Sequence, residues 1–266
     1  MSTDSEIYLR LTIFFSICFI MAFWEFLRPK RRLSFTRIQR WPANLSIILV
    51  GSVLVRLILP ISLTAIAIVF QKYHFGLFNF IELPNWSVLI LSILILDLAV
   101  YGQHYFSHRW QWFWRLHRMH HADQDFDFTT GNRFHPVEIL VSSIYKIFII
   151  GLFGIPATVV LIFEIILNAS SVFNHGNVYF PEKLDRILRK VLVTPDMHRV
   201  HHSTELDEMH RNFGFTLSVW DFIFSTYNAQ PKKGHLEMNI GLSEQSDIKK
   251  TGNLFWMLTY PFKKNS

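Results

Sequence analysis

Long apolar runs restrict the fold of this chain more than any other feature of its sequence. They occupy residues 7–27, 44–70, 86–101 and 139–169. Each run reaches or approaches the ~20 residues that a helix needs to cross a bilayer. Half of all residues are hydrophobic, and the mean hydropathy is positive. We therefore predict an all-α integral membrane protein with several transmembrane helices.

A basic segment after the first run predicts the orientation of the chain. Between residues 28 and 43 the sequence has no acid and six basic residues: Arg28, Lys30, Arg31, Arg32, Arg37 and Arg40. The positive-inside rule places this segment in the cytoplasm as a topology determinant and head-group anchor. Residues 1–6 lack the basic start of a signal peptide, so we expect a retained first span with an outside N-terminus. Arg10 and Glu25 lie near opposite ends of that span, where they are expected to reach water.

Ten of the 13 histidines lie between residues 104 and 202. Eight form three tight boxes: His104-x3-His108, His117-x2-His120-His121 and His198-x2-His201-His202. His135 and His175 stand alone between the second and third boxes. Neutral imidazole is the commonest protein ligand for transition metals, and spacings of three and four place side chains on one helical face. Ten imidazoles are too many for one metal ion and suit two, so we predict a dinuclear metal site.

A shared metal site requires the chain to bend between the first two boxes. At about 100° per residue, the nine steps from His108 to His117 would point those boxes in opposite directions on one straight helix. We therefore predict a bend or break within residues 109–116.

The run 139–169 is too long for one untilted span, and it has Gly154, Ile155 and Pro156 at its middle. Either one kinked span or a re-entrant helical hairpin fits this pattern. Only the hairpin returns the third box to the side of the first two. Lys146 and Glu164, on opposite arms, are then expected to pair.

The predicted architecture is therefore three full transmembrane helices, a re-entrant hairpin and a histidine-rich catalytic cap on the cytoplasmic face. The second of these spans is interrupted at Pro60. We divide the chain into an N-terminal transmembrane region (1–92), a catalytic domain (93–227) and a polar, basic C-terminal tail (228–266).

Several functional classes are disfavoured by composition and motifs. The single cysteine, Cys18, allows no intramolecular disulfide and no CxxC motif. The formal net charge of +6 is explained by basic cytoplasmic loops, because no nucleic-acid-binding motif accompanies it. The absence of HExxH argues against a zinc protease. Because imidazole suits iron, zinc, copper and nickel alike, three classes stay open: a di-iron oxygenase, a zinc-dependent membrane hydrolase using the same histidines, and a metal transporter or sensor. The last is disfavoured because the boxes flank the spans instead of lining them.

The residues around the histidines resemble those of the fatty acid hydroxylase/sterol desaturase superfamily. The likeness covers residues 93–227 and includes the three boxes in order, RFHP around His135, NHGN around His175, and NFGFTLSVWDFIFSTY after the third box. The segment that usually ends WD-x2-FGTY has Ser225 in place of the glycine.

This resemblance implies a helical, membrane-bound di-iron oxygenase that hydroxylates or desaturates a C–H bond of a lipid, whether fatty acyl, sterol-like or ether lipid. The implied cofactors are two Fe ions, with Zn as a possible substitute, and O2 is the co-substrate. The implied metal ligands are the histidines of the boxes and the two lone ones: His104, His108, His117, His120, His121, His135, His175, His198, His201 and His202. No other catalytic residue and no organic cofactor site is implied. No GxGxxG fingerprint is present, so we expect a separate electron donor: a reductase, a ferredoxin or a cytochrome b5-like protein.

Polar residues near the boxes are candidates for orienting the ligand imidazoles. We expect Glu138 and Asp196 to hydrogen-bond their outer nitrogens. Asp97 is expected either to orient a histidine or to pair within the membrane. Asp221 is predicted to be structural, and His210 to be a surface residue.

Overall fold

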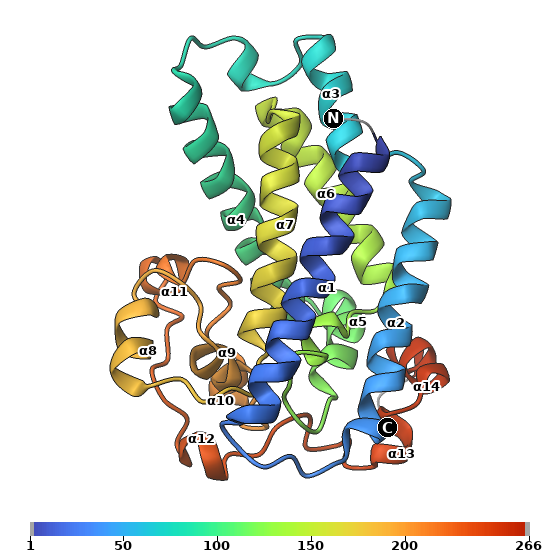
Figure 1. Cartoon of the computed structure of the whole chain (residues 1–266), viewed down its shortest axis with the longest axis vertical. Helices are drawn as coiled ribbons and strands as arrows, with labels where there is room; N and C mark the ends of the chain where they lie inside the picture. The colour runs from blue at the N-terminus through green and yellow to red at the C-terminus, as the bar shows by residue number, and fades with distance from the viewer. Residues whose placement is uncertain (1–2, 264–266) are drawn as a thin grey trace.

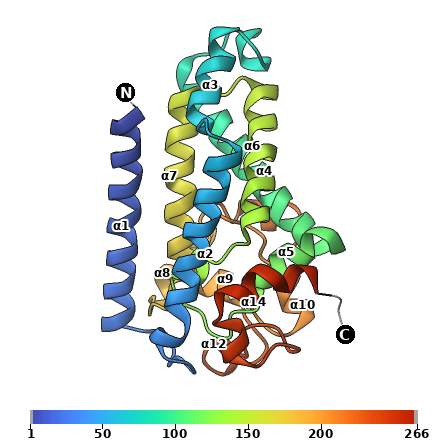
Figure 2. The same cartoon turned by 90° about the vertical axis from the view of Figure 1, so that its right-hand side faces the viewer.

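Five apolar helical segments stand side by side along the long axis of the molecule (Figure 1, Figure 2). The computed structural model describes residues 3–263. The long helices are α1 (Thr3–Leu27), α2 (Arg37–Ile58), α4 (Asn85–Arg109), α6 (Pro136–Phe153) and α7 (Ala157–Asn174). Each belongs to a segment long and apolar enough to cross a membrane, and the described secondary structure is helical apart from isolated β-bridges. The prediction of an all-α, multi-pass integral membrane protein is confirmed.

The second apolar segment is interrupted where the sequence has Pro60. α2 ends at Ile58, and α3 (Leu63–Lys72) begins after Ser62, whose Oγ accepts a hydrogen bond from the Ala65 N–H at 3.1 Å. A short 3-10 helix, η1 (Leu77–Asn79), follows. Proline has no N–H and disfavours a helical conformation in the residue before it. The predicted interruption is confirmed.

α4 extends beyond the predicted end of the third span and carries His104 and His108 in its last turns. Trp110 then leaves the helix with an extended backbone (φ −99°, ψ 119°), and α5 (Gln111–His121) starts in a new direction. The predicted break within residues 109–116 is confirmed.

α6 and α7 form the predicted hairpin. Gly154 caps α6 in the left-handed region (φ 69°, ψ 41°), and α7 begins after Pro156. A Cβ on Gly154 would lie 2.8 Å from the Phe75 carbonyl oxygen, so glycine is required there by both conformation and space. Each arm has 18 residues and is itself long enough to span a membrane. The structure therefore has five candidate spans where the sequence predicted three and a re-entrant hairpin.

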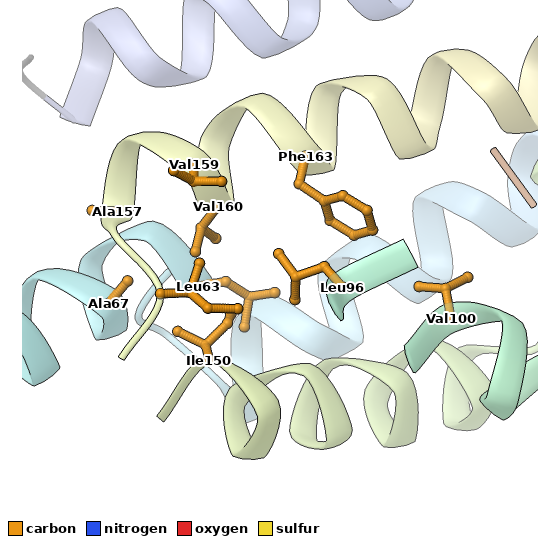
Figure 3. Packing of buried hydrophobic residues seen from close by; sticks show 10 residues of the cluster. Leu63, Ala67, Leu96, Val100, Ile150, Ala157, Val159, Val160 and Phe163 are labelled. Atoms are coloured by element: carbon orange, nitrogen blue, oxygen red, sulfur yellow. The ribbon is translucent and has the colours of Figure 1, made fainter. Parts of the chain in front are cut away.

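Apolar side chains from α3, α4, α6 and α7 pack together in the bundle (Figure 3). The buried residues of this cluster include Leu63, Ala67, Leu96, Val100, Ile150, Ala157, Val159, Val160 and Phe163. Three charged residues in the bundle are paired with one another. Lys146 Nζ lies 3.7 Å from Glu164 Oε1, as predicted, and Arg10 donates to Glu164 Oε2 at 2.8 Å. Ion pairing lowers the cost of placing these charges among apolar helices.

Glu25 does not reach water as predicted. Its side chain is buried, and Oε1 accepts hydrogen bonds from the backbone N–H groups of Phe128 and Asn177 at 2.7 and 2.9 Å. These two hydrogen bonds tie the end of α1 to the loops of the cap.

The remaining elements gather as a cap at one end of the bundle, around α5 (Figure 1). They are η2 (Thr130–Asn132), α8 (Glu182–Leu188), α9 (Pro195–His201), α10 (Leu206–Met209), α11 (Val219–Ile223), α12 (Gly234–Glu237), α13 (Ile248–Thr251), α14 (Leu254–Thr259) and η3 (Tyr260–Phe262). The basic segment between α1 and α2 lies at the same end as the cap.

The segment predicted as a polar C-terminal tail is folded onto the cap over its described residues, 228–263. Trp256 and Met257 of α14 are buried against Ala43 and Ile47 of α2 and Met119 of α5. The segment is rich in charged residues and only a few apolar residues face the core, so its composition did not predict this packing. Residues 1–2 and 264–266 of the predicted terminal segments lie outside the described residues.

Candidate metal centre

Nine histidines come together in two buried groups inside the cap. The five-histidine group contains His104, His108, His117, His121 and His201. The four-histidine group contains His120, His175, His198 and His202. Within each group, one ring nitrogen from every histidine lies within 4.8 Å of those of the others. All nine side chains are buried.

Helical spacing explains how each box is divided between the groups. α5 sends His117 and His121, four residues apart, to the five-histidine group, and His120 to the other. α9 and its C-cap do the reverse, because His198 and His202 join the four-histidine group while His201 joins the other. On a helix, residue i+4 is rotated by about 40° from residue i in one direction and residue i+3 by about 60° in the other, so the three rings share a broad face but diverge on it. Each HxxHH box therefore serves both groups.

The two groups adjoin each other. The rings of His121 and His202 stack with their centroids 4.5 Å apart, although they belong to different groups. The His198 and His201 rings also meet across the boundary, at 5.1 Å. The arrangement therefore offers two neighbouring sites and not two independent ones.

Hydrogen bonds to the outer nitrogens orient four of the rings. Each donates from Nδ1 to an oxygen at 2.7–2.8 Å: His104 to Phe213 O, His117 to Glu138 Oε1, His175 to Ser171 O, and His201 to Arg211 O. These oxygens can only accept, so Nδ1 carries the proton and Nε2 carries the free lone pair. Outer hydrogen bonds of this kind fix the ring orientation of metal-ligating histidines and raise their basicity.

The inner nitrogens fit a pair of cations. The Nε2 atoms of His117 and His201 are buried without a hydrogen-bond partner among the described residues. In the four-histidine group, His175 Nε2 lies 3.2 Å from His120 Nε2 and 3.1 Å from His198 Nε2. Buried polar atoms are normally paired, and leaving one unpaired costs about 1–3 kcal/mol. A metal ion among each set of nitrogens would satisfy these lone pairs.

Electrostatics favours the ligand form of the imidazoles. Burial lowers the pKa of His175 to about 4. It also lowers the pKa values of His120, His121, His198, His201 and His202 well below the usual range. Neutral imidazole is the form that binds metals. A donor set made only of imidazole nitrogens suits iron, zinc, copper or nickel.

His135 lies outside both groups. It is the N-cap of α6, where Nδ1 accepts the Val137 N–H at 3.2 Å, and its Nε2 lies 3.3 Å from Leu258 O. Both ring nitrogens are thus engaged away from the metal centre. The cause is local, because Pro136 starts α6 and leaves His135 in the capping position. The other lone histidine, His175, belongs to the four-histidine group.

The comparisons with known proteins agree with this site. A model of the family described as "Fatty acid hydroxylase" matches residues 89–226, which include all nine grouped histidines. This chain belongs to the fatty acid hydroxylase family. No solved structure matches it.

Curated relatives include lipid-modifying enzymes. An ornithine lipid hydroxylase from Rhizobium tropici is 26% identical over 157 residues, covering 59% of this chain and 46% of the relative. Alkylglycerol monooxygenases from Caenorhabditis elegans and Homo sapiens are 28% and 26% identical, covering 62% and 65% of this chain and 32% and 37% of the relatives. The chain thus matches less than half the length of each of these relatives.

Ser225, which replaces the glycine usual in this family, has a backbone conformation that favours glycine. Ser225 has φ 58°, in the left-handed region that favours glycine. Its neighbour Asp221 is structural, as predicted. Asp221 accepts the N–H groups of Phe213 and Gly214, both at 2.8 Å. It thereby holds the segment whose Phe213 carbonyl accepts from His104.

Among the predicted orienting acids, only Glu138 contacts a grouped histidine. Asp196 instead pairs with Lys30, at 2.6 Å, and with Arg199. Asp97 accepts the Trp220 Nε1–H at 2.8 Å, so it connects α4 to the cap and orients no imidazole. The prediction for Asp196 was wrong, and of the two alternatives for Asp97 only the orienting role was wrong, because sequence proximity to a box does not fix which side chain faces a ring.

Two further residues differ from their predicted roles. Arg40 is fully buried and pairs with Asp123 at 2.7 Å and Asp127 at 2.5 Å, so it does not anchor lipid head groups. This ion pair fixes the loop that follows the second box. His210 is half-buried, with its ring 5.6 Å from that of His108, and is not a simple surface residue.

A cavity of about 240 Å³ lies against the histidines. Both groups contribute to its wall, through His104 and His117 and through His120 and His198. A second cavity, of about 230 Å³, shares three lining residues with the first and reaches α1. These shared residues are Ile48, Ser52 and Asn168. The second cavity therefore lies beside the first, between α1, α2 and α7.

Proposed function

We propose that this protein is a membrane-bound di-iron oxygenase that uses O2 and external electrons to hydroxylate or desaturate a C–H bond of a lipid. The observation that carries the proposal is the pair of adjoining all-histidine groups at the wall of one cavity. Membership of the fatty acid hydroxylase family supports it, as do relatives named as lipid hydroxylase and alkylglycerol monooxygenase. A bound iron pair would supply the O2 chemistry that no side chain supplies unaided.

The residues of the chain have separable tasks in this proposal. The nine grouped histidines hold the two ions, and Glu138 keeps the His117 Nδ1 proton so that Nε2 faces the metal. Apolar walls from α2, α6 and α7, including Ile48, Ile139 and Leu167, exclude water and place an acyl or alkyl chain beside the histidines. The lipid enters from the bilayer between α1, α2 and α7.

The proposed orientation places the cap in the cytoplasm. Arg28 and Arg32 lie exposed in the segment between α1 and α2, at the cap end of the bundle. Basic segments near membrane spans favour the cytoplasmic side. A separate donor, a reductase, ferredoxin or cytochrome b5-like protein, would then deliver electrons to the cap.

The test combines metal analysis with turnover of the full purified chain. We expect two irons per chain and lipid oxidation that requires both O2 and a reductant. His120→Ala and His201→Ala, one from each group, should lose metal and activity. The matched control is His74→Asn, an exposed position with φ 51° that asparagine tolerates. Tightly held zinc with oxygen-independent hydrolysis would overturn the proposal in favour of a zinc hydrolase. If the proposal holds, comparative lipidomics of cells that carry the wild-type protein or His120→Ala would identify the substrate.

A further inference from the structure

A third, larger cavity forms a groove on a different face of α4 from the grouped histidines. It has a volume of about 980 Å³ and runs between α4 and α6 down to the cap; we call it the α4–α6 groove. Leu98, Gly102, Tyr105 and Arg109 line it from α4, and their spacing of three or four forms one helical stripe. None of the nine grouped histidines lines it. Phe213, whose ring lies 5.2 Å from Tyr105 and 5.7 Å from His104, stands between the groove and the metal centre.

Gly102 faces open space in this groove. A Cβ at Gly102 would meet no atom within 4 Å, whereas a Cβ at helical Gly51 would lie 2.6 Å from Ile139 Cδ1. Close packing thus explains Gly51 but not Gly102. A glycine inside a helix is less stable than alanine by about 0.5–1 kcal/mol. No neighbouring atom of the protein requires glycine at position 102. The absence of a side chain there leaves space in the groove for a ligand.

The two ends of the groove differ in chemistry. Its membrane end is apolar and includes Ile149 and Phe153 of α6. Its cap end carries Arg109 and Arg211, both exposed and without an ion-pair partner among residues 3–263. Asp207, the acid at this end, is already paired with Lys232. The cap end is therefore cationic.

Preorganisation supports an anion site there. Arg211 Nη1 donates to Ser225 O at 2.8 Å, and the Arg109 guanidinium lies 5.2 Å above the Tyr105 ring. Arginine binds phosphate through two parallel hydrogen bonds, and basic pockets between membrane helices bind anionic head groups. The stripe from Leu98 to Arg109 rises about 16 Å along the helix. That is half of the ~30 Å hydrocarbon core, the depth of one leaflet.

We propose that the α4–α6 groove binds an anionic phospholipid that is not the substrate. Its acyl chain lies along Leu98 and Gly102 against Phe153, and its phosphate contacts Arg109 and Arg211. The lipid fills the space between α4 and α6 and stabilises the helix that carries His104.

The test measures lipid binding to the purified full chain in detergent, by native mass spectrometry and thermal melting. We expect phosphatidylglycerol to bind and to raise the melting temperature, while phosphatidylcholine and inorganic phosphate do neither. Gly102→Leu places a branched side chain in the path of the acyl chain and should weaken phosphatidylglycerol binding at least tenfold while the protein stays folded. Gly102→Ala adds only a methyl group and should retain binding.

Head-group recognition is tested with a second pair of variants. Arg109→Gln should weaken binding at least tenfold, whereas Arg28→Gln, an exposed arginine at the cap end of α1, should not. Equal binding by Gly102→Leu and wild type would overturn the proposal. So would equal stabilisation by inorganic phosphate, which shows an anion site alone, or by phosphatidylcholine, which shows no head-group selection. Oxidation of the bound phosphatidylglycerol by the iron-loaded protein would make this lipid a substrate and overturn its assigned role.

Discussion

Replacing Glu138 tests whether the metal centre depends on the orientation of its histidines. The Glu138 carboxylate accepts the His117 Nδ1 proton at 2.7 Å, and both side chains are buried. Because Glu138 belongs to α6 and His117 to α5, this bond also joins two elements that meet only through tertiary packing. Glu138→Ala removes the acceptor and leaves the His117 ring free to turn.

The expected loss follows from the usual effect of such partners. Removing one typically lowers metal affinity or activity about 10- to 100-fold, or about 1.4–2.7 kcal/mol at ~1.36 kcal/mol per factor of ten. Glu138→Gln keeps an oxygen acceptor but removes its charge. Charge-assisted hydrogen bonds are roughly twice as strong as neutral ones, so glutamine should lose about half of that free energy.

Chelator competition on the iron-loaded full chain measures this effect. We expect one of the two ions, that of the five-histidine group, to be released more easily in Glu138→Ala, with Glu138→Gln intermediate. Glu182→Ala is the control, since that side chain is 72% exposed at the surface of α8. Thermal melting of each variant separates metal release from unfolding. Unchanged affinity at both sites in a folded Glu138→Ala protein would refute the reasoning.

Three further predictions follow from single side chains. His135→Ala should keep both metal ions and lose about 0.5–2 kcal/mol of stability with its helix cap, whereas His120→Ala should lose metal; metal analysis and melting distinguish the two, and metal loss in His135→Ala would contradict its placement. Burial raises the pKa of Asp125 to about 6. A carboxyl whose pKa folding raises contributes most stability below its ordinary pKa of about 4, and this contribution is lost as pH rises through 6. Asp125→Asn should therefore gain stability relative to wild type between pH 4 and 8, by up to about 3 kcal/mol; parallel pH profiles of melting would disprove this. Ser225→Gly should raise stability by about 1 kcal/mol because Ser225 occupies the left-handed region, and a lower melting temperature would argue against that strain.

Patterns among residues close in sequence predicted the helices and showed that the site is built from histidines. The apolar runs indicated spans, Gly154 and Pro156 indicated the hairpin turn, and the angle between His108 and His117 required a break. These features depend on residues close in sequence, whose geometry follows from helix periodicity and backbone conformation.

Only the tertiary structure decided which faces meet. His135 and His175 were equivalent candidates in sequence, yet one caps α6 and the other completes the four-histidine group. Arg40 lay in a basic run typical of a membrane surface, but the loop holding Asp123 folds over it and buries it. Periodicity describes one face of one helix. The partner of that face is set by contacts between residues far apart in the chain, and those contacts divide the histidines between two groups.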